Sequence, residues 1–164
     1  MIVFMVELNT VNKAKEFEDK SLLIVDDDNP FRERLARAME KKGFLVTQAE
    51  GVKKGIESLK TMEPAFAVVD LRLRDGNGLE VVKEIQKLNK NSRIIMLTGY
   101  GNIPTAVAAI KHGAIDYLAK PADADDVEKA LLADPNTKAS PPENPMTADR
   151  VRWEHIHRVF KLCN

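Results

Sequence analysis

The segment SLLIVDDDNP, residues 21–30, places three aspartates directly after a run of four apolar residues. Four consecutive apolar side chains, from Leu22 to Val25, are typical of a β-strand. Two carboxylates about 4 Å apart repel each other by roughly 4 kcal/mol at an effective dielectric constant near 20. The aspartates that follow this strand therefore either lie in water or share a cation.

Short apolar runs alternate with helical patterns between residues 21 and 133. We predict strands at residues 22–25, 44–49, 65–69, 93–97 and 116–118. We predict helices at residues 30–42, 52–61, 79–88, 104–111 and 124–132. Five strand–helix units in succession predict an α/β fold, with a parallel sheet and helices on both of its faces. In such folds ligands bind at the carboxyl ends of the strands.

The composition is that of a globular protein, with 44% hydrophobic and 30% charged residues in a chain of 164. A formal net charge of zero gives no reason to expect a membrane or nucleic-acid partner for the chain as a whole. The single cysteine, Cys163, excludes an internal disulfide framework and favours a cytoplasmic location. The apolar start, MIVFMV, is too short to span a membrane and lacks the basic region of a secretory signal.

Three further segments flank the α/β domain that we predict at residues 21–133. Residues 1–20 are interpreted as an N-terminal extension, to which we assign no function. Residues 134–147 contain four prolines and no apolar periodicity, which predicts an extended linker. Residues 148–164 predict a C-terminal helix that carries Trp153, Ile156 and Phe160 on one stripe.

Two short polar motifs have ordinary structural explanations. Asn29 before Pro30 predicts a helix N-cap followed by proline at the first helical position, with Asp28 assisting the cap. The segment DGNG, residues 75–78, predicts a turn. Neither motif explains the two aspartates that precede Asp28.

Polar side chains follow four of the five predicted strands. They are Asp26 and Asp27 after the first strand, Asp70 after the third, Thr98 after the fourth and Lys120 after the fifth. Because the carboxyl ends of parallel strands meet at one edge of a sheet, we expect these side chains to form a cluster. Clustered carboxylates bind a hard cation such as Mg²⁺, and a carboxylate can also be the nucleophile that accepts a phosphoryl group. Asp70, on a central strand, is our candidate for that nucleophile.

At these residues the chain resembles the receiver domain of two-component response regulators, from Ser21 to Leu132. The resemblance implies a doubly wound, flavodoxin-like sheet of five parallel strands in the order 2-1-3-4-5. It implies that Asp70 is the phosphoacceptor. It implies a Mg²⁺ site formed by Asp26, Asp27, Asp70 and the backbone carbonyl of Arg72. It also assigns phosphate-contacting or switching roles to Thr98, Lys120 and Tyr117.

Longer segments narrow the resemblance to the RegA/PrrA/ActR group of redox-responsive transcriptional regulators. These segments are DLRLRDGNGLEVVKEI, LTGYGNIPTAVAAIKHGAIDYLAKP and ENPMTADRVRWEHIHRVF. In that group the tail helix opens a Fis-like helix-turn-helix domain, so residues 148–164 would be its first helix. The remaining helices have no counterpart here, and we expect no binding to operator DNA by the residues present alone. The chain also departs from many receivers at Arg74, where they carry a proline.

The leading hypothesis is a phosphorylation switch that is not an enzyme. The resemblance implies that a sensor histidine kinase phosphorylates Asp70, that transcription is regulated, and that phosphorylation can produce a homodimer; it implies no membrane partner. The alternative is a stand-alone receiver that acts through protein–protein contacts without binding DNA.

Two other classes fit the sequence less well. A haloacid-dehalogenase-like phosphatase places its nucleophile after the first strand in a DxDx[TV] motif, whereas Asp28 is followed here by Asn29 and Pro30. A flavodoxin-like cofactor binder is disfavoured because the acidic residues after the first strand would repel a cofactor phosphate.

Overall fold

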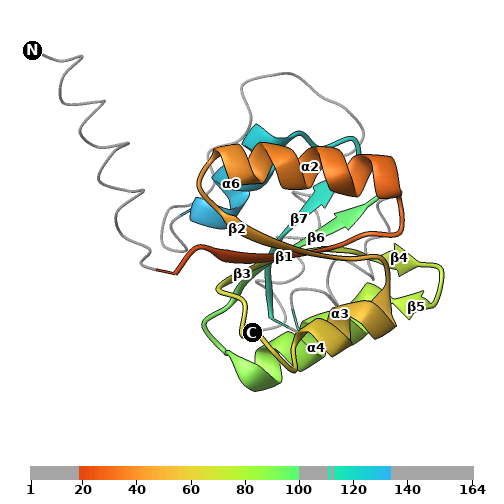
Figure 1. The fold of residues 1–164 in the computed structure, drawn as a ribbon. Coiled ribbons are helices and arrows are strands. Elements are labelled where there is room, and N and C mark those ends of the chain that lie inside the picture. Colours follow the sequence, from red (N-terminus) through yellow and green to blue (C-terminus); the bar gives the residue numbers. More distant parts are fainter. Residues whose placement is uncertain (1–18, 100–110, 112, 134–164) are drawn as a thin grey trace, which may run out of the picture.

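A five-stranded parallel sheet forms the centre of the domain (Figure 1). The computed structural model describes residues 19–99, 111 and 113–133. The strands lie in the order β2-β1-β3-β6-β7. Their bounds are β1 Ser21–Val25, β2 Leu45–Ala49, β3 Phe66–Asp70, β6 Arg93–Thr98 and β7 Ala114–Ala119. Counted along this sheet alone, the order is 2-1-3-4-5, which confirms the predicted sheet.

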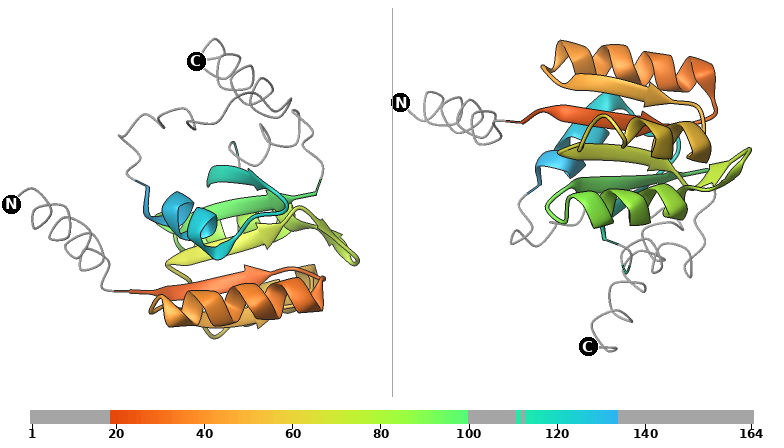
Figure 2. Two further views of the ribbon diagram at one scale, coloured as in Figure 1. Left: turned by 90° about the horizontal axis from the view of Figure 1, so that it is seen from above. Right: turned by 60° about the horizontal axis from the view of Figure 1, so that its bottom comes forward.

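Helices cover both faces of the sheet, which confirms the doubly wound arrangement (Figures 1 and 2). On one face lie α2 (Asn29–Lys41) and α6 (Ala124–Leu132). On the other face lie α3 (Val52–Ser58) and α4 (Gly78–Leu88). Among the described residues, no helix is both long and apolar enough to cross a membrane.

Several predicted segments lie outside the described residues. These are the helix at residues 104–111 except for Lys111, the extension at residues 1–20 except for its last two residues, the linker at 134–147 and the helix at 148–164 with Cys163.

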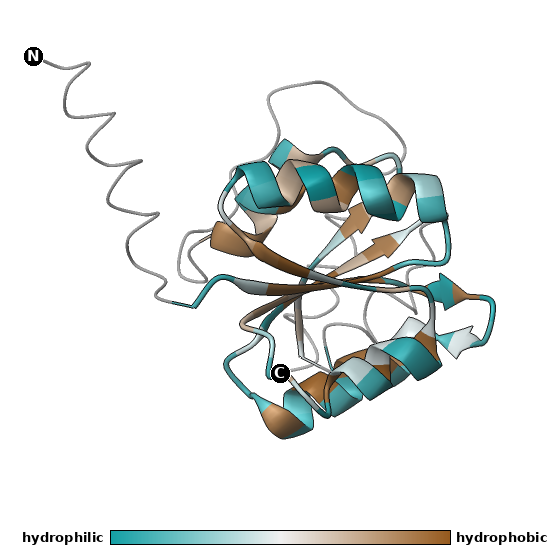
Figure 3. Ribbon diagram, viewed as in Figure 1, coloured by the Kyte–Doolittle hydropathy of each residue, from teal (hydrophilic) through white to brown (hydrophobic). Residues whose placement is uncertain are grey.

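Alternating strand residues divide the core into two layers. Figure 3 shows hydrophobic colour along the strands that lie between the helices. Leu22 and Ile24 pack with α2 and α6, whereas Leu23 and Val25 pack with α3 and α4. All four are fully buried, as expected of a parallel strand that is covered on both faces. The apolar residues that precede the aspartates therefore pack against helices on both faces of the sheet.

The cap of α2 corrects one prediction. Asp28, and not Asn29, is the N-cap residue, and its carboxylate accepts a hydrogen bond from the Phe31 amide at 3.1 Å. Asn29 is the first helical residue, and Pro30 follows it without losing a bond because the first-turn amides have no partner inside the helix. A charged carboxylate at this point also interacts favourably with the helix dipole.

A short hairpin after β3 was not predicted. β4 (Arg72–Leu73) pairs antiparallel with β5 (Gly76–Asn77), so only the first part of the DGNG segment lies in a turn. Asn77 ends the hairpin and caps α4, since its side chain accepts a hydrogen bond from the Leu79 amide at 2.9 Å. The turn prediction for residues 75–78 was therefore too simple, because the segment also contains a strand and a helix cap.

Long-range polar contacts hold α6 in place. Lys42 Nζ, after α2, lies 2.6 Å from Asp125 Oδ1 and 2.5 Å from Glu128 Oε2. At the other end of α6, the Arg93 guanidinium donates to the backbone carbonyls of Leu131, at 2.5 Å, and of Ala133. The last helix of the domain is thus bound to both α2 and the start of β6.

Truncation of Leu23 should measure how strongly the covered sheet depends on its core. Leu23→Ala is expected to lower the free energy of unfolding by about 2–5 kcal/mol, because it leaves a cavity in a fully buried layer. Leu45→Ala makes the same truncation on the adjacent strand at a side chain that is 72% exposed, and should cost about 0.5 kcal/mol or less. Urea unfolding of both variants checks this, and equal losses would contradict it.

Candidate functional site

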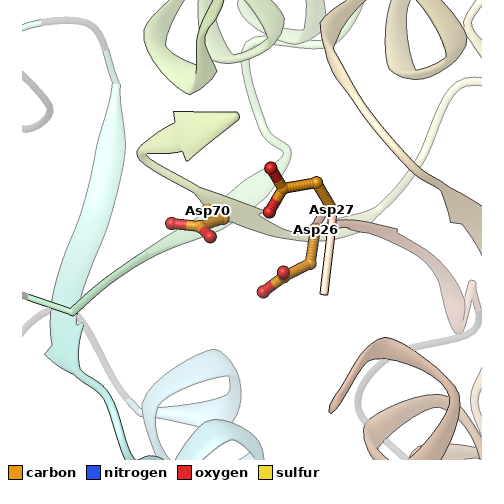
Figure 4. Close-up of side chains that lie close together, drawn as sticks. All are labelled: Asp26, Asp27 and Asp70. Carbon is orange, nitrogen blue, oxygen red and sulfur yellow. The ribbon is translucent and has the colours of Figure 1, made fainter. Parts of the chain in front are cut away.

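Three aspartates meet at the carboxyl ends of β1 and β3 (Figure 4). β1 pairs with β3 so that Val25 lies opposite Val69, which brings the next residues, Asp26 and Asp70, side by side. Each of Asp26, Asp27 and Asp70 offers a carboxylate oxygen, and these oxygens all lie within 4.8 Å of one another. Asp26 and Asp70 are buried, and Asp27 is partly exposed. The structure thus brings the three predicted carboxylates into one cluster.

Lys120 neutralises part of this cluster from the end of β7. Its ammonium Nζ lies 2.6 Å from Asp26 Oδ2 and 3.0 Å from Asp70 Oδ2. The same Nζ lies 4.7 Å from the centre of the Phe31 ring, at the start of α2, in a cation–π contact. Lys120 therefore bridges the two buried carboxylates, and these contacts together with the Phe31 ring fix the position of its ammonium group.

Thr98 and Tyr117 lie on the two strands beside the cluster. Thr98 is the last residue of β6 and is buried, one position beyond the residue that pairs with Asp70. Its backbone carbonyl accepts a hydrogen bond of 2.7 Å from the Lys120 amide, which ties the ends of β6 and β7 together. Tyr117 is partly buried and packs against the core layer on the side of α3 and α4. The structure places Tyr117 in packing, so its switching role stays a prediction.

Backbone contacts fix the positions of the carboxylates. Asp26 Oδ1 accepts a hydrogen bond from the Asp28 amide at 2.8 Å, and Asp70 Oδ1 accepts one from the Arg72 amide at 3.3 Å. Arg32 Nη1 donates to the backbone carbonyl of Asp26 at 2.7 Å. The backbone of Arg72, which the resemblance implies as a ligand, is therefore in contact with the carboxylate of Asp70. Arg32 and Phe31 were not predicted as site residues, because their contacts cross between elements.

Gly78 was also missed, and its role follows from close packing. A Cβ atom on Gly78 would lie 2.1 Å from the backbone carbonyl oxygen of Asp70. The Gly78 amide also donates to the carbonyl of Leu71 at 2.9 Å. Only glycine lets α4 begin this close to the backbone of Asp70. A glycine that opens a helix, where most residues are better helix formers, was the available signal.

Arg74 lies at the rim of the cluster. Its Nε is 3.6 Å from Asp27 Oδ2, but its side chain is 86% exposed, so the pair is weak. Both residues line a surface pocket of about 780 Å³ that also reaches Lys53 and Asp75. The cluster is therefore open to solvent at Asp27.

Burial and the neighbouring charge have opposite effects on the pKa of Asp70. Burial raises the pKa of the Asp70 carboxyl, while the hydrogen bond from Lys120 opposes that shift. Burial alone would lower the pKa of the Lys120 ammonium, but hydrogen bonds to Asp26 and Asp70 raise it. Lys120 bridges two of the three carboxylates, and the third, Asp27, has only the weak pair with the exposed Arg74, which leaves uncompensated negative charge. This donor set fits a hard, oxygen-preferring divalent cation.

A comparison with protein families connects this geometry to known proteins. The family model of the response regulator receiver domain matches residues 22–132. The chain is 61% identical over 145 residues to the acid tolerance regulatory protein ActR of Rhizobium meliloti, which covers 88% of this chain and 75% of ActR. It is 60% identical over 146 residues to the photosynthetic apparatus regulatory protein RegA of Rhodobacter capsulatus, which covers 89% of this chain and 79% of RegA.

Solved structures show the same likeness. A response regulator from Burkholderia pseudomallei, crystallised with a phosphorylated aspartic acid, a calcium ion and citrate, has a TM-score of 0.72 and 37% identity. That likeness covers 89% of this chain and 86% of the other. A CheY-like receiver domain from Methanospirillum hungatei has a TM-score of 0.66 and 28% identity, over 70% and 91% of the two chains.

The raised pKa of Asp70 predicts a pH-dependent stability. Between the ordinary value of 3.8 and the raised value, the folded protein binds this proton more tightly than the unfolded chain does. Wild-type stability should therefore fall as the pH rises through that window. Asp70→Asn removes the group, so in metal-free buffer the variant should gain stability relative to wild type as the pH rises above 3.8.

The matched control for this experiment is Asp125→Asn. The hydrogen bond from Lys42 lowers the pKa of Asp125, so this carboxylate stabilises the fold above 3.8 and loses that effect as the pH falls through its lowered value. The control should therefore lose stability relative to wild type at neutral pH. Urea unfolding at several pH values measures the free energy of unfolding of both variants. If the difference in stability between Asp70→Asn and wild type does not change with pH, the prediction is contradicted.

The close approach at Gly78 predicts that adding one methyl group there will strongly reduce the stability of the fold. Gly78→Ala should lower the free energy of unfolding by about 1–3 kcal/mol, because the Cβ atom would push α4 away from the Asp70 backbone. Gly99→Ala is the control, since no atom of the described residues lies within 4 Å of its Cβ position, and its effect on stability should be within about 0.5 kcal/mol. Similar unfolding midpoints for the two variants would refute the proposed role of Gly78.

Proposed function

The chain belongs to the response regulator receiver domain family, and we propose that Asp70 is the residue that accepts a phosphoryl group from a sensor histidine kinase. One observation carries the proposal. The carboxylates of Asp26, Asp27 and Asp70 and the ammonium of Lys120 meet at one edge of the sheet. Family membership supports two-component signalling in general, and the residues supply the specific chemistry.

The transfer step is a nucleophilic substitution at phosphorus. A carboxylate oxygen of Asp70 attacks the phosphorus of a phosphohistidine, and an O–P bond forms as the P–N bond breaks. The electron pair of the P–N bond stays with the imidazole nitrogen, which takes up a proton. Attack requires the ionised form of Asp70, so the hydrogen bond from Lys120 favours the reactive carboxylate over the protonated acid that burial would favour.

We further propose that Asp26, Asp27, Asp70 and the backbone carbonyl of Arg72 hold Mg²⁺. A bound Mg²⁺ neutralises charge on the oxygens of the transferring group. The carboxylate cluster has the oxygen donors and the excess negative charge that such a cation requires. The calcium ion and phosphorylated aspartic acid in the Burkholderia pseudomallei structure support the same assignment.

After transfer, the new charge has to be stabilised by residues on β6 and β7. Lys120 can move its hydrogen bonds from the carboxylates to the phosphoryl oxygens without leaving the site. The Thr98 hydroxyl, at the end of β6, would donate to the phosphoryl group, and Tyr117 would follow. Those movements would alter the surface that includes β7 and α6, which could promote a homodimer.

The output that we propose is transcriptional regulation in the cytoplasm and not catalysis on an external substrate. ActR and RegA are named as regulatory proteins, and both align with most of this chain. In this proposal residues 21–133 form the receiver and residues 134–147 the linker, while residues 148–164 begin the output domain through which DNA would be bound. Residues 1–20 precede the receiver as an extension.

Phosphorylation assays test the proposed acceptor. Incubation of the wild-type chain with acetyl phosphate and Mg²⁺ should produce a phosphorylated species on phosphate-affinity gels, and Asp70→Asn should produce none because the nucleophile is absent. Asp26→Asn should reduce the rate at least about tenfold, since it removes a ligand and charge from the cation site. Asp125→Asn, on the surface of α6, is the control and should react like wild type. Normal labelling of Asp70→Asn would remove the assignment.

A further inference from the structure

Asp75 lies in the turn of the β4–β5 hairpin but bonds to a different element. Its carboxylate accepts hydrogen bonds from the backbone amides of Val52, at 2.9 Å, and Lys53, at 3.0 Å. These two amides belong to the first turn of α3, and the N-cap residue Gly51 makes no side-chain cap bond. The N-terminus of α3 is therefore capped by a hairpin residue that is more than twenty positions away in sequence.

The base of the same hairpin lies at the cation site. The Arg72 amide donates to Asp70 Oδ1, so the first hairpin residue is in direct contact with the acceptor carboxylate. The Leu71 amide donates to the carbonyl of Leu97 at 2.9 Å, which fixes the chain where it leaves β3. The hairpin is thus held at its base by the sheet and at its tip by α3. Arg72 lies between these two fixed ends, and its backbone carbonyl is the proposed ligand of the cation.

We propose that Asp75 is a positioning residue for the cation site, which ties the hairpin tip to α3 and so holds the backbone carbonyl of Arg72 beside the three aspartates. This inference rests on the proposed function, in which that carbonyl is a ligand of Mg²⁺.

The physical reasons for a tether are local. Two pairs of residues make up the hairpin, and a two-stranded ribbon of that length has little stability of its own. The proline that many receivers carry at position 74 would stiffen the loop, but this chain has an exposed arginine there. Two charge-assisted hydrogen bonds to a helix N-terminus supply the missing rigidity. The bonds from Lys53 and Val52 lower the pKa of Asp75, so the tether is intact at neutral pH.

Gly51 makes it possible to separate tethering from simple helix capping. A Cβ atom on Gly51 would lie 2.5 Å from Asp75 Oδ1, so the wild-type chain has no room for a capping side chain at this position. Gly51 has an extended backbone, with φ −176°, which any residue adopts. Once Asp75 is truncated, a serine at position 51 can cap α3 from within its own helix without restoring the link to the hairpin.

The experiment compares Mg²⁺ affinity and thermal stability in four full-length proteins: wild type, Asp75→Ala, Asp75→Ala/Gly51→Ser and Asp123→Ala. Asp123 caps α6 by accepting a bond from the Asp126 amide at 2.8 Å, so Asp123→Ala removes a helix cap that has no link to the hairpin. Isothermal titration with Mg²⁺ alone gives the dissociation constant, and the melting temperature is read without metal.

We expect Asp75→Ala to weaken Mg²⁺ binding about tenfold and to lower the melting temperature, because an outer residue that orients a ligand is lost together with a cap. Asp75→Ala/Gly51→Ser should recover most of the melting temperature but not the affinity. Asp123→Ala should lower the melting temperature alone. This pattern would show that the tether, and not the cap, acts on the cation site.

Three results would overturn the inference in distinguishable ways. Recovery of both quantities in the double variant would mean that Asp75 only caps α3. An unchanged affinity in Asp75→Ala, with normal binding by wild type, would refute the positioning role and leave the proposed function intact. A wild-type protein that binds no Mg²⁺ at millimolar concentrations would refute the proposed cation site and this inference with it.

Discussion

The register between β1 and β3 is the constraint on which the rest of the site depends. Val25 lies opposite Val69, so the residues that follow, Asp26 and Asp70, emerge side by side at the carboxyl edge of the sheet. Two buried carboxylates in this position repel each other unless cations compensate them. Lys120, brought to the same edge by β7, bridges both and provides part of that compensation. The remaining negative charge is what suits the edge to a divalent cation and a phosphoryl group.

Several contacts hold the carboxyl edge of the sheet in place. Arg32 holds the backbone of Asp26, Gly78 allows α4 to begin against the backbone of Asp70, and Asp75 ties the next hairpin to α3. Each contact joins two different elements of the fold. The metal site that we propose would need such support, because the orientation of a ligand depends on the residues that hold it.

This arrangement is consistent with a phosphorylation switch in which the participating residues are already in contact. Asp70, Lys120 and the end of β6 are joined by direct hydrogen bonds, since the Lys120 amide donates to the carbonyl of Thr98 and its side chain donates to Asp70. A change of charge at Asp70 would therefore act at once on the strand that carries Lys120. Along the chain, β7 leads through residues 120–123 into α6, and α6 is itself bound to α2 through Lys42.

The sequence by itself determined the fold class and which charged side chains meet at the carboxyl edge of the sheet. Periodicity located the strands, and strand ends identified Asp26, Asp27, Asp70, Thr98 and Lys120, because parallel strands place their carboxyl ends at one edge. The strand order came from family resemblance, since periodicity does not say which strands are neighbours.

Only the tertiary structure decided which residues support that chemistry. It showed that Asp28 is the N-cap of α2, revealed the hairpin after β3, and showed which groups Gly78 and Asp75 contact. These features depend on distances between elements that are far apart along the chain. Local sequence patterns report periodicity and turn preference, but they contain no information on such distances.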